Sequence, residues 1–433
     1  MERIDNVNIC TGGQVVFGSV TTDRATIADI EVTGQAKQGA PCLLPGCVDA
    51  HVHFREPGLT LKADIASESR AALAGGVTTV LDMPNVKPTT TTPQALEQKH
   101  QLYREKCLVN YGLWYGITAD NIDEAIELYG RPDSPKRDEI CGFKVFLGSS
   151  TGGMLMNDQE RLRHLFANTQ RVIGIHSESE DIIARHRQQF QALYGEDVPV
   201  ELHPKIRDAE ACMATTRMAV QLAIETGAQL HVCHLTTQME LDYISQLKTQ
   251  LTLDNITMEV TPAHLWFSQE DYRTHGTLIK CNPAIKRIQD RDALRRALAH
   301  DLYSIGTDHA PHLLSDKQGG ALRAASGMPS IQFSLLAALQ LMDQGYMTLP
   351  RLVELMSTNP ARRFGLTDRG EIAVGKRADL VLVDPSQSTH VTRDIILSKC
   401  GWSPFEGTTF NYSITQTWVN GRPIDKRPPI PPA

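Results

Sequence analysis

Residues 45–58 read PGCVDAHVHFREPG, and this stretch decides how the rest of the chain is interpreted. A short apolar run leads directly into His51 and His53, and Arg55 follows two residues later. Alternate side chains of a strand point to the same face, so the two histidines would share one face. A glycine and two prolines bracket the segment, as happens where a buried strand ends. The stretch predicts a strand that ends in functional side chains; a strand end with two solvated histidines is the alternative at this point.

Short apolar runs alternate with amphipathic stretches after residue 46. Helical stretches include 62–74, 93–106, 120–129, 179–193, 206–226 and 288–300. Eight strands are predicted, at 46–52, 77–82, 110–116, 142–147, 171–176, 229–234, 256–260 and 302–307. Eight alternations of strand and helix are typical of an α/β fold of the closed (β/α)8, TIM-like barrel type. An open doubly wound sheet is the alternative, but no G-x-G-x-x-G follows the first strand.

The two ends of the chain have a different pattern. Residues 1–45 and 366–433 contain short β-like pieces punctuated by glycine, such as GQVVFG and ADLVLVD. We expect these ends to form one small β-sandwich-like domain, with the barrel, residues 46–365, inserted between them. The tail RPPIPPA is rich in proline and is not expected to pack.

Composition limits the classes of function. The 433 residues are 41% apolar and 21% charged, which is ordinary for a soluble globular enzyme. The net charge is −7 without a long basic run, which argues against nucleic acid or an anionic membrane as partner. No stretch approaches the ~20 apolar residues of a membrane span, and the start has no apolar signal core. Nine scattered cysteines without a C-x-x-C pair favour a reduced cytoplasm, with Cys233 and Cys281 expected in core packing.

Polar residues fall at the predicted strand ends, where barrel enzymes carry out their chemistry. These residues are His51, His53, Asn85, Lys144, His176, His234 and Asp308. Four neutral imidazoles and a carboxylate suit zinc or a similar divalent ion. They exceed the three protein ligands that a catalytic zinc normally uses, so the pattern predicts two metal ions with a bridging ligand.

Lys144 is the unusual member of this set. A protonated ammonium beside two dications is strongly disfavoured, but a deprotonated lysine can react with carbon dioxide to give a carbamate. That anionic group has two oxygens and can bridge two metal ions. The alternative is that Lys144 extends to the surface from an ordinary strand, and the residues alone leave both open. Two divalent metal ions carry four positive charges, and the carbamate, Asp308 and a bridging hydroxide would offset three of them. The remaining positive charge would favour an anionic substrate.

The motifs DAHVHFREPG, DMPNVKP, GFKVFLGSS, GIHSE, HVCHLTT, CNPAIK and GTDHAPH occur in this order. They resemble the signature blocks of dihydroorotases in the amidohydrolase superfamily, and STNPARRFGL, GEIAVGKRADLVLVD and GWSPFEG resemble that group's C-terminal blocks. The resemblance covers about residues 43–421. It implies two zinc ions per subunit, bridged by N6-carboxylated Lys144. His51, His53 and Asp308 would bind one ion, and His176 and His234 the other. His231 and His309 receive no role, and His231 is expected to be structural.

The resemblance also implies a reaction. Dihydroorotases catalyse the reversible hydrolysis of (S)-dihydroorotate to N-carbamoyl-L-aspartate in de novo pyrimidine (UMP) biosynthesis. A metal-bridging hydroxide would attack the ring carbonyl, with Asp308 as general acid and base. The substrate's carboxylate and ring would be contacted by Arg55, Asn85, Asn282 and His312. A small-molecule substrate and a homodimer are expected.

Two alternatives to this function stay open. An allantoinase- or hydantoinase-like enzyme would act on a ring without the carboxylate, and Arg55 argues against it. An inactive scaffold protein would usually have lost metal ligands, whereas all six are present here. Ala263, Ser330 and Gln332 depart from the usual pattern, and we expect them to tune substrate contacts. The segments GSSTGG and 313–326 are expected to move over the substrate.

Overall fold

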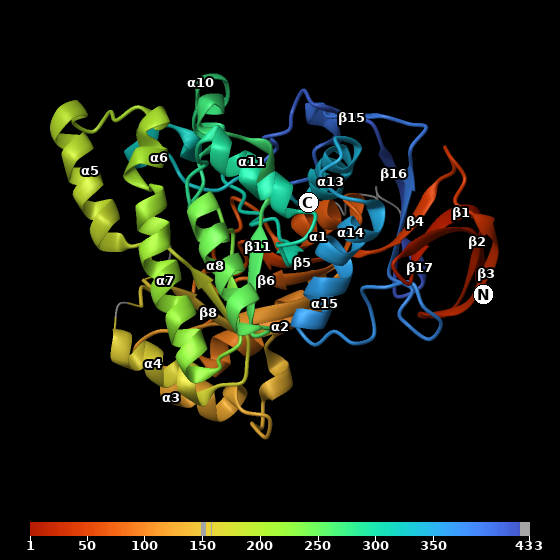
Figure 1. The fold of residues 1–433 in the computed structure, drawn as a ribbon, viewed down its shortest axis with the longest axis horizontal. Helices are drawn as coiled ribbons and strands as arrows, with labels where there is room; N and C mark the ends of the chain where they lie inside the picture. The colour runs from red at the N-terminus through yellow and green to blue at the C-terminus, as the bar shows by residue number, and fades with distance from the viewer. Residues whose placement is uncertain (149–152, 157, 425–433) are drawn as a thin grey trace.

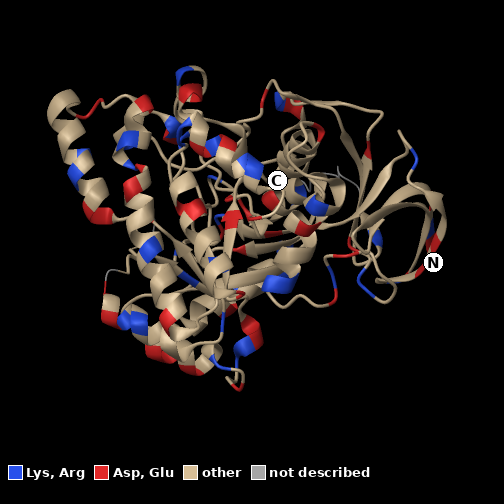
Figure 2. Cartoon of the chain, viewed as in Figure 1, with Lys and Arg blue, Asp and Glu red and all other residues tan. Residues whose placement is uncertain are grey.

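A computed structural model describes residues 1–148, 153–156 and 158–424. Most of GSSTGG, and the proline-rich tail, therefore lie outside the described residues. Within the described ranges, no helix has the length and apolar character needed to cross a membrane. Figure 2 shows positively and negatively charged residues interspersed along the outer helices.

The barrel is an eight-stranded parallel sheet whose strands neighbour one another in chain order (Figure 1). The strands are β5 (Cys47–Val52), β6 (Val77–Asp82), β7 (Asn110–Gly116), β8 (Gly142–Phe146), β9 (Ile173–His176), β10 (Leu230–Val232), β11 (Ile256–Val260) and β12 (Ser304–Ile305). A parallel bridge between Val52 and His309 joins the last strand region to the first, and the His53 amide donates to the His309 carbonyl at 2.8 Å. The predicted barrel is confirmed, and each of its eight predicted strands overlaps an observed one.

Helices connect and cover these strands (Figure 1). They are α1 (Ile65–Ala74), α2 (Pro93–Lys106), α3 (Ile122–Ala125), α4 (Gln159–Asn168), α5 (Glu180–Tyr194), α6 (His203–Ile206), α7 (Ala209–Thr226), α8 (Gln238–Leu251), α9 (Pro262–Trp266), α10 (Tyr272–His275), α11 (Ile288–Ala297), α12 (Gly320–Arg323), α13 (Ser334–Asp343), α14 (Leu349–Val353) and α15 (Asn359–Arg363). The side chains of Asp64, Asp208 and Thr237 accept from the first turns of α1, α7 and α8. Such caps satisfy amides that have no partner within the helix, and they fix where each helix begins.

Both termini contribute to a second, seven-stranded sheet, in the order β17-β16-β13-β4-β1-β2-β3. Its strands are β1 (Glu2–Thr11), β2 (Gln14–Asp23), β3 (Thr26–Gln35), β4 (Cys42–Pro45), β13 (Leu380–Asp384), β16 (Ser413–Val419) and β17 (Arg422–Ile424), and β14 (Thr389–His390) pairs separately with β15 (Thr409–Phe410). The expected β-domain from both termini is confirmed. The boundaries 1–45, 46–365 and 366–433 stay a prediction.

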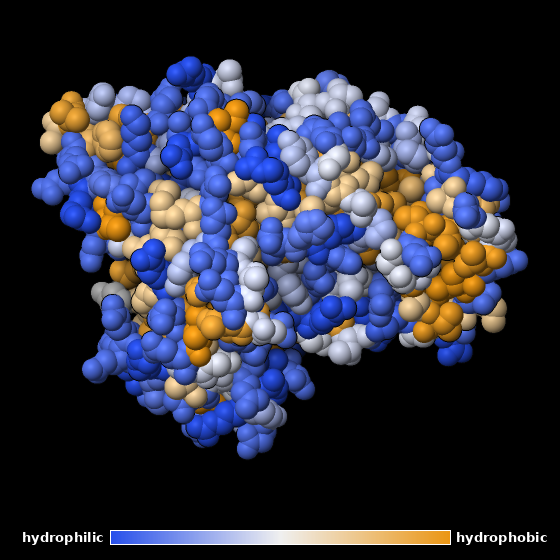
Figure 3. Space-filling view, in the orientation of Figure 1, coloured by the Kyte–Doolittle hydropathy of each residue, from blue (hydrophilic) through white to orange (hydrophobic). Residues whose placement is uncertain are grey.

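This sheet has a small apolar core of its own, which includes Ile9, Val20, Leu380 and Trp418. Figure 3 shows apolar side chains gathered on the surface over the same sheet. The edge strand β3 carries Val32, which is 56% exposed. The far larger barrel core holds the strands that present the candidate site.

A buried ion pair supports the barrel beneath the site. Lys99 Nζ of α2 lies 2.6 Å from Asp82 Oδ2 at the end of β6, and both side chains are fully buried. Asp82 Oδ1 also accepts from the Phe54 amide, directly after His53, at 2.9 Å. The pair therefore connects α2 to the segment that carries the first two histidines.

Replacing Lys99 by methionine should lower the free energy of unfolding by about 3–5 kcal/mol, because it leaves the Asp82 carboxylate buried without its cation. Urea denaturation of the variant measures the loss. The double variant Lys99→Met/Asp82→Asn, in which no charge is left unpaired, should recover much of it. A loss below about 1 kcal/mol in the single variant would show that the pair carries little of the stability.

Candidate active site

The ten residues singled out from the sequence line one cavity of about 450 Å³. They are His51, His53, Arg55, Asn85, Lys144, His176, His234, Asn282, Asp308 and His312. These residues come from β5, β8 and β9 and from the segments that follow β5, β6, β10, β11 and β12. The carboxyl ends of parallel barrel strands meet at one face, which explains how residues far apart in sequence converge.

Three of these residues have left-handed backbone conformations that non-glycine residues rarely adopt. The φ angles are 68° at Arg55, 38° at His234 and 47° at Asp308. Such conformations cost energy and persist where the surrounding structure imposes them, most often at functional sites. The backbone here is shaped to direct these three side chains into the cavity.

His51, His53 and Asp308 form the first half of the candidate metal centre. Asp308 Oδ1 lies 2.9 Å from His53 Nε2 and 3.3 Å from His51 Nε2. The other nitrogen of each ring makes a hydrogen bond to a neighbouring side chain. His51 Nδ1 lies 2.9 Å from Glu259 Oε1, and His53 Nδ1 lies 2.7 Å from Asn85 Oδ1. Partners of this kind fix the orientation of metal-binding histidines.

His176 and His234 form the second half. His176 Nδ1 lies 3.1 Å from His234 Nε2, and His176 Nε2 lies 2.9 Å from Glu178 Oε2. Arg207 pairs with the same Glu178 oxygen and fixes it. Within the described residues, the buried Nδ1 of His234 has no hydrogen-bond partner. Two imidazole nitrogens that face each other without an intervening acceptor suit a shared cation.

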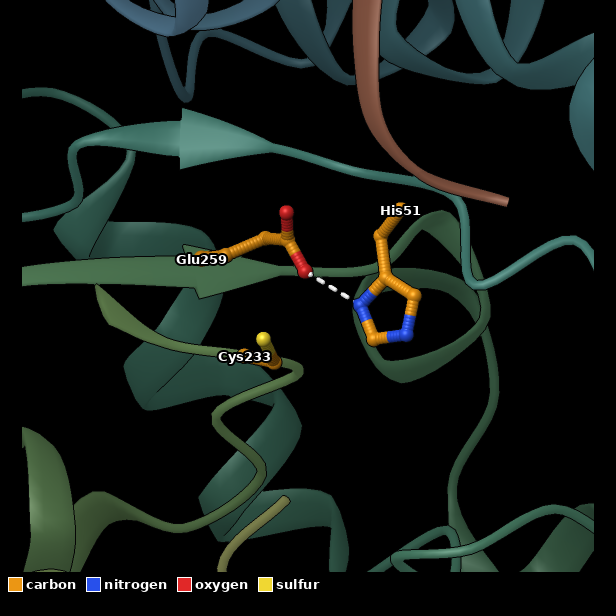
Figure 4. A group of neighbouring side chains, drawn as sticks. All are labelled: His51, Cys233 and Glu259. Carbon is orange, nitrogen blue, oxygen red and sulfur yellow. Dashed lines mark hydrogen bonds and ion pairs between the residues drawn. The ribbon is translucent and has the colours of Figure 1, made fainter. Parts of the chain in front are cut away.

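Lys144 is fully buried in β8, which excludes the alternative that it extends to the surface. Its Nζ donates to Cys233 Sγ at 3.3 Å, and no carboxylate in the described part of the chain lies within ion-pair distance of it. Cys233 was expected in core packing; it is buried but also lies beside the Glu259–His51 pair (Figure 4). A buried lysine without an anionic partner is compatible with conversion to a carbamate.

The protonation states of the site suit a cation. Burial lowers the pKa of His53 to about 4, and it also lowers the pKa of His176 and His234, so these rings are neutral and carry lone pairs. Burial and Lys144 oppose protonation of His51, but Asp308 and Glu259 raise its pKa to about 10. A proton on His51 offsets part of the negative charge of these two carboxylates, and a divalent ion held by the same side chains would offset it fully. The residues present therefore fit a metal centre.

Arg55 lines the cavity and is 4% exposed. Its Nε donates to the Pro311 carbonyl at 3.1 Å, and its pKa is lowered by burial to about 10, so it stays charged at neutral pH. Glu56, the neighbouring acid that could have neutralised it, pairs with Lys106 instead. Among the described residues, no carboxylate lies within ion-pair distance of Arg55. This buried guanidinium is available for an anionic ligand.

Both asparagines line the cavity, with different roles for their oxygens. The side-chain oxygen of Asn85 orients His53, so the side-chain NH2 group of Asn85 is left to donate to a ligand. Asn282 Oδ1 is buried and has no hydrogen-bond partner in the described part of the chain, so it is available to accept a hydrogen bond from a ligand.

Two acidic residues that support the site received no role from the sequence. Glu259 is fully buried in β11 and holds His51, and its other oxygen lies 3.4 Å from His231 Nε2. Glu178 holds His176. For Glu259, the only signal in the sequence was an acidic residue within the apolar strand ITMEV, and this signal does not reveal which residue the acid contacts. His231 also contacts Thr257 and serves this support, as expected for a structural residue.

The expectation that Ala263, Ser330 and Gln332 tune substrate contacts stays a prediction. None of them belongs to the cavity wall formed by the described residues. Ser330 Oγ donates to the Thr307 carbonyl, and Gln332 bonds the backbone of residues 395 and 397. Their hydrogen bonds hold the chain behind the site.

Comparisons with known proteins agree with this geometry. A profile of the amidohydrolase family matches residues 42–424. Dihydroorotase from Methanosarcina mazei is 34% identical over 375 residues, covering 84% of this chain and 79% of the relative. Dihydroorotase from Halobacterium salinarum is 34% identical over 414 residues, covering 94% and 88%. The solved L-hydantoinase (dihydropyrimidinase) from Arthrobacter aurescens superposes with a TM-score of 0.88 at 25% identity, covering 97% and 95%. The chain therefore belongs to the amidohydrolase family of hydrolases.

Proposed function

We propose that this hydrolase is a dihydroorotase, which opens (S)-dihydroorotate to N-carbamoyl-L-aspartate and catalyses the reverse ring closure. The observation that carries the proposal is Arg55, a buried charge in the cavity with no carboxylate partner among the described residues. Dihydroorotate is a six-membered cyclic amide with one carboxylate, and a guanidinium fork matches a carboxylate with two parallel hydrogen bonds.

Substrate recognition and the chemical step would use different residues of the cavity. Arg55 and His312, whose Nη2 and Nε2 lie 3.1 Å apart, would bind the substrate carboxylate, and Asn85 and Asn282 would contact the rest of the ligand. Binding the carboxylate at a fixed point orients the ring amide toward Asp308, so part of the barrier is removed by positioning.

Two zinc ions are the metals that this donor set suits. His51, His53 and Asp308 would hold one, His176 and His234 the other, and N6-carboxylated Lys144 would link them. When bound, such ions supply Lewis-acid polarisation of the amide carbonyl and lower the pKa of a water nucleophile toward neutrality.

Asp308 is the proposed general acid and base. Burial disfavours its charged form, but His51 and His53 hold its pKa at about 2, so the carboxylate is ionised at neutral pH. It can accept the proton of the attacking water and deliver it to the ring nitrogen as the C–N bond breaks. In ring closure the same oxygen takes the proton from the attacking nitrogen.

This function would place the protein in de novo pyrimidine (UMP) biosynthesis. The cytoplasmic location and the homodimeric state stay predictions of the sequence. A ring without a carboxylate is the second candidate substrate, because the L-hydantoinase from Arthrobacter aurescens shares the fold over nearly the whole chain. That candidate leaves the buried charge of Arg55 without a counter-ion, which costs free energy in the bound complex.

The variant Arg55→Met tests the proposal. It should lower kcat/KM for L-dihydroorotate by about 10²- to 10³-fold, because truncating one partner of a buried charge pair costs several kcal/mol. Metal content, measured alongside, should stay at the wild-type level. Arg185→Met, which removes an exposed cation from α5, is the matched control and should be neutral. Unchanged kcat/KM in Arg55→Met would remove the basis of the proposal.

A further inference from the structure

The imidazole of His312 lies between two cationic side chains. Its Nε2 lies 3.1 Å from Arg55 Nη2, and its Nδ1 lies 2.9 Å from Lys62 Nζ. Lys62 follows β5 and also lies 3.5 Å from Asp316 Oδ2. Arg55 and His312 line the cavity, whereas Lys62 does not belong to the described residues of its wall. Lys62 therefore contacts the His312 ring on the side that faces away from the cavity.

These three groups contain more donors than they can pair. Burial, Arg55 and Lys62 hold the pKa of His312 far below its usual range, so the ring is neutral and has one N–H and one lone pair. An ammonium and a guanidinium carry only donors. The single lone pair can accept from Lys62 or from Arg55, but not from both. Asp316 Oδ2, which lies 3.5 Å from Lys62 Nζ and 3.8 Å from His312 Nδ1, and the Ser326 carbonyl are further acceptors beside the ring. When Lys62 takes the lone pair, Arg55 Nη2 is therefore the donor that is left without an acceptor among the described residues.

The contact lengths indicate which donor takes the lone pair. Lys62 makes the shorter contact, at 2.9 Å, and Arg55 already has an acceptor for its Nε in the Pro311 carbonyl. With Nδ1 accepting from Lys62, the proton of the ring is on Nε2, beside Arg55 Nη2. Two N–H groups of different residues then lie side by side at the cavity wall, where one anionic oxygen can accept from both.

We propose that Lys62 is a positioning residue that fixes the Nε2–H tautomer of His312, so that His312 and Arg55 together bind the carboxylate of the substrate. The substrate carboxylate supplies the acceptor that Arg55 Nη2 lacks among the described residues. Lys62 thereby determines specificity for carboxylate-bearing ligands without touching them. The inference rests on the proposed function for the identity of the ligand, while the tautomer depends only on the contacts within the protein.

The experiment compares Lys62→Met with wild type in the zinc-loaded full chain. Calorimetric titration with N-carbamoyl-L-aspartate should show about tenfold weaker binding in the variant, the loss expected for one charge-assisted hydrogen bond. N-carbamoyl-β-alanine lacks the carboxylate that this cluster would bind, and its affinity should not change. Lys62→Arg, which keeps a donor-only cation, should restore most of the affinity. Lys87→Met is the matched control, because Lys87 is an exposed cation close enough to Lys62 to affect its pKa, and it makes no hydrogen bond to the His312 ring among the described residues.

Nitrogen-15 NMR of histidine-labelled protein gives a readout that a purely structural role would not move. The His312 ring, assigned with His312→Gln, should carry its proton on Nε2 in wild type and shift toward Nδ1–H in Lys62→Met. A wild-type ring with its proton on Nδ1, an unchanged tautomer in the variant, or equal loss of both ureido acids would overturn the inference. If the wild type binds and shows this tautomer but does not hydrolyse dihydroorotate, the proposed function fails while the positioning role stands.

Discussion

Replacing Asp308 by asparagine is expected to lower kcat for L-dihydroorotate by about 10²- to 10⁴-fold, the range typical of losing a general acid and base. The amide cannot accept the proton of water or return one to the ring nitrogen. The left-handed backbone at Asp308, with φ of 47°, is tolerated by asparagine as well as by aspartate. The change therefore tests the carboxylate and leaves the backbone that positions it.

Steady-state kinetics in both directions measure this loss, because the same carboxylate is proposed to act in hydrolysis and in ring closure. Metal analysis of the same sample separates a lost proton carrier from a lost ligand: kcat should fall further than metal content. Asp301→Asn removes an exposed carboxylate before β12 and serves as control. If Asp308→Asn keeps more than about a tenth of wild-type kcat in both directions, another group carries the proton.

Lys144→Ala is expected to abolish the paired metal centre. The variant should bind about one zinc ion per chain or fewer and should lose at least about 10³-fold in kcat, because a metal ion contributes several kcal/mol to such a barrier. The physical reason is that N6-carboxylated Lys144 would supply an anionic group with two oxygens between the histidine pairs. Elemental analysis gives the zinc-to-protein ratio directly.

The carbamate itself has an independent signature. Wild-type protein prepared with ¹³C-bicarbonate and zinc should show a carbamate carbon resonance that is absent from Lys144→Ala and present in the surface control Lys136→Ala. Two zinc ions per chain in Lys144→Ala, with kcat close to wild type, would contradict the bridging role. Metal pairing without a carbamate signal in wild type would assign the bridge to another ligand.

The barrel and the set of candidate ligands could be predicted from the sequence because their signals are local. His51 and His53 are two residues apart on one strand, and each remaining ligand directly follows or lies in an apolar run. The closed parallel sheet then brings these strand ends to one face without further information from the sequence.

The supporting contacts could not be predicted because each joins residues that are distant along the chain. Glu259 and His51 are separated by 208 positions, and Lys62 and His312 by 250. The local sequence around Glu259 (ITMEV) and around Lys62 (the segment after FREPG) does not indicate which distant residue each side chain contacts. The placement of Ser330 and Gln332 outside the described cavity wall could not be predicted either, since a motif position near the site does not reveal which way a side chain points.

The most direct test of the central claim is the kcat/KM of the zinc-loaded wild-type protein for L-dihydroorotate, measured beside dihydrouracil, hydantoin and allantoin. A buried guanidinium that needs a carboxylate predicts a preference for L-dihydroorotate of at least about 10²-fold. Equal or faster turnover of any ring without the carboxylate would contradict the role of Arg55 and assign the chain a different cyclic amide as substrate.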